Sequence, residues 1–168
     1  MKEFLKSLYK ALYNEDLVKT VTIEVPPIKQ KTNSDKLCDI AYKWYGKDPT
    51  PKDEVSDEVS CVFSLTTILR EIVPDFPILS YTPDLLKQMM LDTRFKVSKE
   101  FNEGNIVISV TNSGNGRIMG HTGIVGHNGK ILSNNSETGL WLDKYDISMW
   151  IERYSRQGGL VLYIFELL

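Results

Sequence analysis

The sequence predicts an α+β domain in which helices precede a small antiparallel sheet. Apolar residues first recur with the helical period and later alternate in short runs rich in β-branched residues. The predicted helices span 34–45, 60–73 and 82–91. The predicted strands span 95–97, 105–111, 121–126, 130–135 and 160–167, and one more helix, 147–156, precedes the last of them.

Local signals mark where the helices begin. Asn33 or Ser34 can cap the first helix through its side-chain oxygen. Residues 82–84 combine a capping hydroxyl, a proline in the first turn and an acid near the positive end of the helix dipole. Asp146 or Ser148 can cap the last helix, and each of these starts follows a turn-forming or extended stretch.

Composition restricts the function classes. A chain of 168 residues that is 42% hydrophobic fits one compact domain that buries its own core. Its 20 basic and 22 acidic residues nearly cancel and form no basic run, which argues against a nucleic-acid partner. Cys38 and Cys61 lack the spacing of a zinc site, although one bridge between them stays open. We therefore expect no metal and no organic cofactor.

The chain divides into three segments. We expect residues 1–19 to form an amphipathic helix, residues 20–33 an extended linker, and residues 34–168 the folded domain. Charges interrupt the apolar positions of 1–19, so this segment resembles neither a signal peptide nor a membrane span. We expect synthesis in the cytoplasm without a signal peptide and no stable membrane insertion. The first helix can dock on the domain, self-associate, or contact a membrane surface or a partner.

Cys61 is the first candidate for chemistry, because Ser60 places it in the first turn of a predicted helix. The positive end of the helix dipole favours an anion there, so we expect the thiol pKa to fall and the thiolate to act as nucleophile. The backbone N–H of Cys61 can also serve an oxyanion hole. The alternative is a buried core thiol, a common place for cysteine.

The second candidate is a hairpin around residues 128–129, because Asn-Gly between two alternating runs predicts a two-residue turn. Counting outward from this turn places His121 and Asn134 on one sheet face as diagonal neighbours. A bulge would transfer the role of Asn134 to Asn135, and a longer turn would transfer it to Ser133. His121 is then the base and the amide its orienter, in a Cys-His-Asn arrangement.

The other histidine, His127, lies at the mouth of the predicted turn, and we interpret it as a solvated loop residue. No His-x-x-x-His or comparable cluster is present in the sequence, so a zinc site would need carboxylates. His121 is therefore the histidine to which the sequence assigns chemistry.

Four short motifs lie around the candidate residues, at 57–61, 104–108, 120–125 and 133–136. They resemble motifs of the NlpC-like and CHAP amidase cell-wall hydrolases, particularly their small phage-type and prophage-type members. The resemblance covers about 34–168 and implies a papain-like fold with Cys61 as nucleophile, His121 as base, and Asn134 or Asn135 as orienter. The residues around Cys61 differ from the usual Asp-Cys-Ser-Gly or Gly-Tyr-Cys, and Asn105 stands where Asp is common, which leaves the subfamily and the bond open.

The resemblance implies a peptidoglycan hydrolase that cleaves an amide bond of the cell wall as a cysteine amidase or endopeptidase. Its substrate would be peptidoglycan peptide, reached at the bacterial cell wall after release from the cell, as for a phage lysin. Two alternatives remain open at the level of sequence: a cysteine protease that acts on proteins, and a catalytically inactive binding module of the same fold.

Overall fold

The computed structural model describes residues 30–50, 60–111 and 119–168. The predicted helix 1–19, most of the predicted linker 20–33, and Asp57 and Glu58 of the first motif lie outside the described residues. Contacts divide the chain into two units, Met1–Gln30 and Lys31–Leu168.

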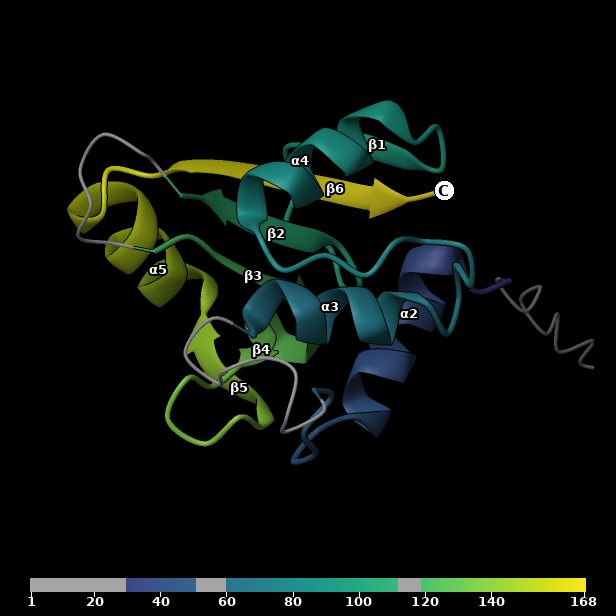
Figure 1. Ribbon diagram of the computed structural model, residues 1–168, viewed down its shortest axis with the longest axis horizontal. Helices are drawn as coiled ribbons and strands as arrows, with labels where there is room; N and C mark the ends of the chain where they lie inside the picture. Colours follow the sequence, from purple (N-terminus) through teal and green to yellow (C-terminus); the bar gives the residue numbers. More distant parts are fainter. Residues whose placement is uncertain (1–29, 51–59, 112–118) are drawn as a thin grey trace, which may run out of the picture. The chain divides into compact units, whose positions relative to one another are not determined.

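The described residues form an antiparallel six-stranded sheet with helices packed on it, which confirms the α+β class. The strand order is β1-β6-β2-β3-β4-β5, so the last strand lies between the first two (Figure 1). The helices are α2 (Asn33–Lys43), α3 (Cys61–Leu69), α4 (Thr82–Leu91) and α5 (Ile147–Trp150). The strands are β1 (Phe95–Ser98), β2 (Ile106–Val110), β3 (His121–Val125), β4 (Lys130–Asn134), β5 (Trp141–Asp146) and β6 (Val161–Leu167).

Helix α2 begins one residue earlier than the sequence predicts. Thr32 is the cap, and its side chain accepts a hydrogen bond from the backbone N–H of Asp35 at 3.1 Å. The Asp35 carboxylate in turn accepts from the backbone N–H of Thr32 at 2.8 Å. This reciprocal pair is a capping box, which satisfies two backbone donors at once and so outcompetes a cap at Asn33 or Ser34.

We expect Thr32→Ala to lower the free energy of unfolding by about 1 kcal/mol, because the backbone N–H of Asp35 loses its acceptor, the Thr32 hydroxyl. Urea titration should show a lower midpoint with an unchanged slope. Thr32→Ser keeps the hydroxyl and serves as the matched control, with a midpoint close to that of the unmodified protein. Equal losses in both variants would contradict the capping role.

Of the caps predicted for α4 and α5, the structure confirms the one at α5 and differs at α4. Asp146 caps α5 by accepting from the backbone N–H of Met149 at 2.8 Å, as one of the two predicted alternatives states. Thr82 does not cap α4, whose cap position is Tyr81 without a side-chain bond. The Thr82 hydroxyl instead accepts from the backbone N–H of Thr111 at 3.0 Å, so a tertiary contact replaces the local one.

The last helix is divided. Its first part is α5, and the chain continues as a wider π-helical segment, η3 (Ile151–Gln157), before the turn at Gly158. π-Helical turns are rare and occur frequently at functional sites, because the extra residue shifts which side chains face the protein. Here the segment carries Tyr154 into the core.

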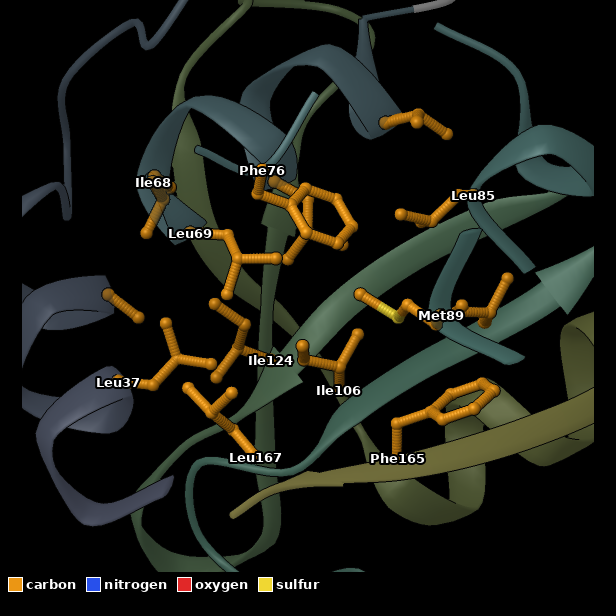
Figure 2. Close-up of a cluster of buried hydrophobic side chains, with 14 of the residues drawn as sticks. Leu37, Ile68, Leu69, Phe76, Leu85, Met89, Ile106, Ile124, Phe165 and Leu167 are labelled. Carbon is orange, nitrogen blue, oxygen red and sulfur yellow. The ribbon is translucent and has the colours of Figure 1, made fainter. Parts of the chain in front are cut away.

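Two hydrophobic cores lie on the two faces of the sheet. The larger one joins α2, α3 and α4 to one face, and Figure 2 shows Leu37, Leu69 and Met89 meeting sheet residues Ile106 and Ile124. The smaller one, under α5 and η3, takes the residues that alternate with these along each strand. Its buried members are Val107, Val125, Ile131, Tyr145, Trp150, Tyr154, Leu160 and Ile164.

The hairpin register differs from the prediction. The connection is a three-residue 3₁₀ turn, η2 (His127–Gly129), with Asn128 at a positive φ of 55°, instead of a two-residue turn. Ile124 therefore faces Leu132, whereas the predicted register put Val125 there. A shift of one residue turns every side chain of β4 to the opposite face relative to β3.

Among the described residues, none of the helices combines the length and apolar character that crossing a lipid bilayer requires.

Candidate active site

Cys61, His121, Asn134 and Asn135 all line one cavity of about 500 Å³. The predicted catalytic residues therefore meet at one place, although Cys61 is distant from the others in the sequence. The cavity opens where α3 begins and where β3 begins. Its other lining residues are Val62, Ser80, Tyr81, Thr82, Thr111, Met119, Gly120, Ser136, Glu137, Lys144, Tyr145, Arg153, Tyr154 and Gln157.

Cys61 is the first residue of α3, and only 8% of it is exposed. Burial raises the pKa of its thiol to about 11, although backbone N–H groups of Thr122, Val62 and Cys61 itself act in the opposite direction. The predicted fall of this pKa is therefore wrong, because desolvation of the thiolate outweighs the helix dipole. Cys61 and Cys38 are both free, so the bridge that the sequence left open does not form.

His121 is the first residue of β3, and its ring is enclosed by aromatic side chains. The imidazole stacks on Trp150 and Tyr154, with ring centroids 5.2 and 5.3 Å away, and meets Tyr145 edge-on at 6.0 Å. Burial, together with the positive charges of Arg153 and Lys144, lowers the pKa of His121 to about 3. The imidazole is therefore neutral at physiological pH in this conformation.

Cys61 and His121 approach the cavity from opposite sides of β3. His121 pairs with Ser109, whose hydroxyl accepts from the Trp150 indole N–H at 3.0 Å, which places the imidazole on the α5 face. Thr122, the next residue, points to the α3 face and lies beside the sulfur. Among the hydrogen bonds of the described residues, none joins Cys61 Sγ to the His121 ring.

The predicted orienter is displaced by the register shift. Asn134 pairs with Trp141 and, one residue beyond Ser133, points to the Cys61 face instead of the His121 face, so the predicted shared face of His121 and Asn134 is wrong. Asn135 is held in a turn, where its side chain accepts from the backbone N–H of Glu137 at 3.0 Å. Both amides line the cavity, and no hydrogen bond described here links either to the imidazole.

Ser133 lies on the same sheet face as His121, as the sequence predicts for a longer hairpin turn. A Cβ added to Gly123, which lies on the His121 face, would come within 3.2 Å of the Ser133 Cβ. The Ser133 hydroxyl is buried and makes no hydrogen bond within the described part of the chain. Ser133 is therefore the alternative that the observed register favours over Asn134, although it does not line the cavity itself.

Sequence reasoning missed the aromatic and cationic wall of the cavity. Strand β5 was not predicted, and it supplies Lys144 and Tyr145. Segment η3 supplies Arg153, whose guanidinium carbon lies 5.9 and 5.6 Å from the ring centroids of Tyr145 and Tyr154. The signal available in the sequence was the density of aromatic residues between 141 and 154.

The charges of this wall do not cancel. Lys144 forms a 3.7 Å ion pair with Glu137, whereas Arg153 has no carboxylate partner among the ion pairs of the described residues. Among the described residues that line the cavity, Lys144 and Arg153 are cationic and Glu137 carries a carboxylate. A guanidinium on an aromatic surface is suited to bind a carboxylate from a ligand.

The second histidine lies outside this cavity. His127 is exposed, as predicted for a loop residue, but it is not simply solvated, because its Nδ1 lies 2.9 Å from a carboxylate oxygen of Glu103. Its position in η2 removes it from Cys61 and leaves His121 as the histidine of the cavity.

Comparison with protein-family models and with curated proteins finds no match to this chain.

Proposed function

We propose that this protein is a papain-like cysteine hydrolase that cleaves an amide bond of bacterial cell-wall peptide, with Cys61 as nucleophile and His121 as base. The observation that carries the proposal is the cavity shared by Cys61, at a helix start, and His121, at the start of a neighbouring strand. The motifs around both residues, which resemble those of cell-wall hydrolases, supply the substrate class. The reaction needs no metal or organic cofactor.

The proposed reaction begins from a neutral thiol and a neutral imidazole, because the pKa of Cys61 is raised and that of His121 is lowered. When the sulfur attacks the substrate carbonyl, His121 accepts the thiol proton, and it then gives this proton to the leaving amine. Water next attacks the thioester and loses a proton to His121. His121 passes this proton to the leaving sulfur as the C–S bond breaks, so the carboxylic acid is released and both the thiol and the neutral imidazole are restored. The N–H of Cys61 at the helix start stabilises the oxyanion.

This reaction requires the imidazole to leave its aromatic stack on the α5 face and pass around the start of β3 to reach Sγ on the α3 face, since the two groups lie on opposite sides of the strand and are not hydrogen-bonded at rest. Substrate charge provides a physical reason for this movement. Burial is the main cause of the lowered pKa of His121, and the positive charges of Arg153 and Lys144 lower it further. A substrate carboxylate beside these two residues offsets the second effect. Imidazolium formation then becomes less unfavourable, so an anionic peptide both binds the site and prepares its base.

Arg153→Gln tests this role of charge. We expect KM to rise about 10-fold for a peptide that bears a carboxylate near the scissile amide, because one charge-assisted contact is lost. The same peptide with that carboxylate amidated should show little change. Arg156→Gln is the matched control, because Arg156 pairs with Glu152 at 3.2 Å and does not line the cavity. Equal effects of both variants on both peptides would contradict the carboxylate contact.

A binding module of the same fold is the second candidate. The raised thiol pKa and the missing bond between Sγ and the imidazole favour it. In that case the cavity binds cell-wall peptide through Arg153 and the aromatic wall without cleaving it. A protein protease that uses the same residues is the remaining alternative, and the choice of substrate distinguishes it.

The deciding experiment is mass spectrometry of muropeptides after incubation of purified cell walls with the full chain, beside a panel of unfolded proteins. New amine and carboxyl ends in the muropeptides identify the bond that is cut and support the hydrolase. Cleavage of proteins but not of muropeptides would show that the chain is a protease and not a cell-wall hydrolase. Binding to cell walls without the appearance of new amine and carboxyl ends would show that the chain is a binding module and not a hydrolase.

A further inference from the structure

We propose that Cys38, Glu103 and His127 form a site for a divalent transition-metal ion of the Zn²⁺ type. The sulfur of Cys38, a carboxylate oxygen of Glu103 and a ring nitrogen of His127 all lie within 4.8 Å of one another. None of the three lines the cavity of Cys61 and His121. The site is therefore separate from the proposed hydrolase chemistry, and it revises the expectation from sequence that no metal is bound.

Three segments that are distant in sequence converge here. Cys38 comes from α2, Glu103 from the turn before β2, and His127 from η2. Gly104 brings the turn against the helix, since its φ is +81° and an added Cβ would lie within 1.8 Å of the backbone oxygen of Ser34. A residue without a side chain is thus required beside Glu103, and the close approach places that carboxylate next to Cys38.

The His127 ring is held in place before any ion binds. It stacks on Tyr42 of α2 with a centroid distance of 4.6 Å and an interplanar angle of 8°. The backbone N–H of His127 donates to the Tyr42 hydroxyl at 2.9 Å, and Nδ1 lies 2.9 Å from the Glu103 carboxylate. A ligand that is oriented in advance loses little freedom when a metal binds.

The donor set indicates the kind of ion. Thiolate, imidazole and carboxylate together are typical ligands of zinc and related transition metals, whereas Ca²⁺ and Mg²⁺ prefer oxygen alone. Zinc–ligand bonds of about 2.0 to 2.3 Å place tetrahedral donors roughly 3.5 Å apart. Donors separated by up to 4.8 Å therefore need to close in by about 1 Å, whereas His127 Nδ1 and the Glu103 oxygen, 2.9 Å apart, need to move slightly apart. A thiolate and a carboxylate balance the two charges of the ion, and three protein ligands leave one position for water.

The three ligands differ in exposure, so an ion can enter the site from solvent. Cys38 is 2% exposed, whereas Glu103 and His127 are exposed, so an ion can reach the sulfur from the side of these two residues. A bound ion would tie α2 to the turn before β2 and to η2. Because the ion binds only the folded arrangement, it should raise the stability of the domain with increasing concentration.

The test uses the tag-free full chain and Co²⁺ as a spectroscopic probe for the zinc site, because a cobalt–thiolate bond gives a charge-transfer band. We expect this band in the unmodified protein, its displacement by Zn²⁺, and a Zn²⁺-dependent rise in Tm. Cys38→Ser, His127→Gln and Glu103→Gln should each weaken Zn²⁺ binding, by about 100-fold or more for Cys38 and His127.

Cys61→Ser is the matched control, because it removes the other cysteine and should leave the cobalt band unchanged. Glu103 and His127 are exposed, so their variants keep the test valid if Cys38→Ser fails to fold. A missing band in the unmodified protein, a band that persists in Cys38→Ser, or a band that is lost only in Cys61→Ser would overturn the proposal. None of these readouts depends on hydrolytic activity.

Discussion

Cys61→Ala should reduce the release of new amines from purified cell walls by at least about 10³-fold, because no other group of the cavity can form the thioester. Turbidity of a cell-wall suspension should fall with the unmodified protein and stay level with the variant. Cys61→Ser keeps the size of the side chain and should be similarly inactive, since a hydroxyl beside a neutral imidazole with a lowered pKa is a poor nucleophile.

Ser64→Ala provides the control within the same helix. Ser64 is buried in α3 and its hydroxyl makes no hydrogen bond within the described residues, and it does not line the cavity. This variant should keep the rate of amine release and the thermal stability. If Cys61→Ala and Ser64→Ala released amines at the same rate, Cys61 would not be the nucleophile.

Acidification should destabilise the protein through His121. Its pKa is about 3 in the folded chain against 6.5 ordinarily, so the unfolded chain binds the extra proton between these values. Stability from this group is present above about pH 6.5 and is lost as pH falls toward 3. The expected slope is up to about 1.4 kcal/mol per pH unit, measured as the free energy of unfolding in urea.

The comparison with His121→Phe isolates this contribution from the titration of carboxylates. Phenylalanine preserves a ring against Trp150 and Tyr154 but binds no proton, so the variant should have a flatter profile between about pH 7 and 5. Parallel profiles for the unmodified protein and His121→Phe would show that the imidazole is not held neutral in the folded chain.

Elements with strong periodicity could be predicted, and those that depend on tertiary contacts could not. The period of apolar residues predicted α2, α3 and α4, and alternation predicted five of the strands. Strand β5 was missed because Asp143 and Lys144 interrupt its apolar pattern, and pairing with β4 decides its conformation instead. The π-helical course of η3 follows from packing of Tyr154 in the core, which no local signal reports.

The candidate site shows the same division. Cys61, His121 and Asn134 could be singled out from residue type and from the elements around them, and they do line one cavity. The orientation of Asn134 could not, because one additional residue in the hairpin turn reverses the face of β4. The cluster of Cys38, Glu103 and His127 was missed because its ligands follow no sequence spacing.

The sequence by itself determined that the domain is α+β, that a cysteine begins a helix, and that a histidine begins a strand, because these features depend on local periodicity and capping. Only the tertiary structure decided that the sulfur and the imidazole both reach one cavity, and that both are neutral there. The physical reason is desolvation, which raises the pKa of Cys61 and lowers that of His121. Cys61 is buried in the core that joins α2, α3 and α4 to one sheet face, and His121 is enclosed by side chains of β5, α5 and η3 on the other. Those segments meet only when the chain folds.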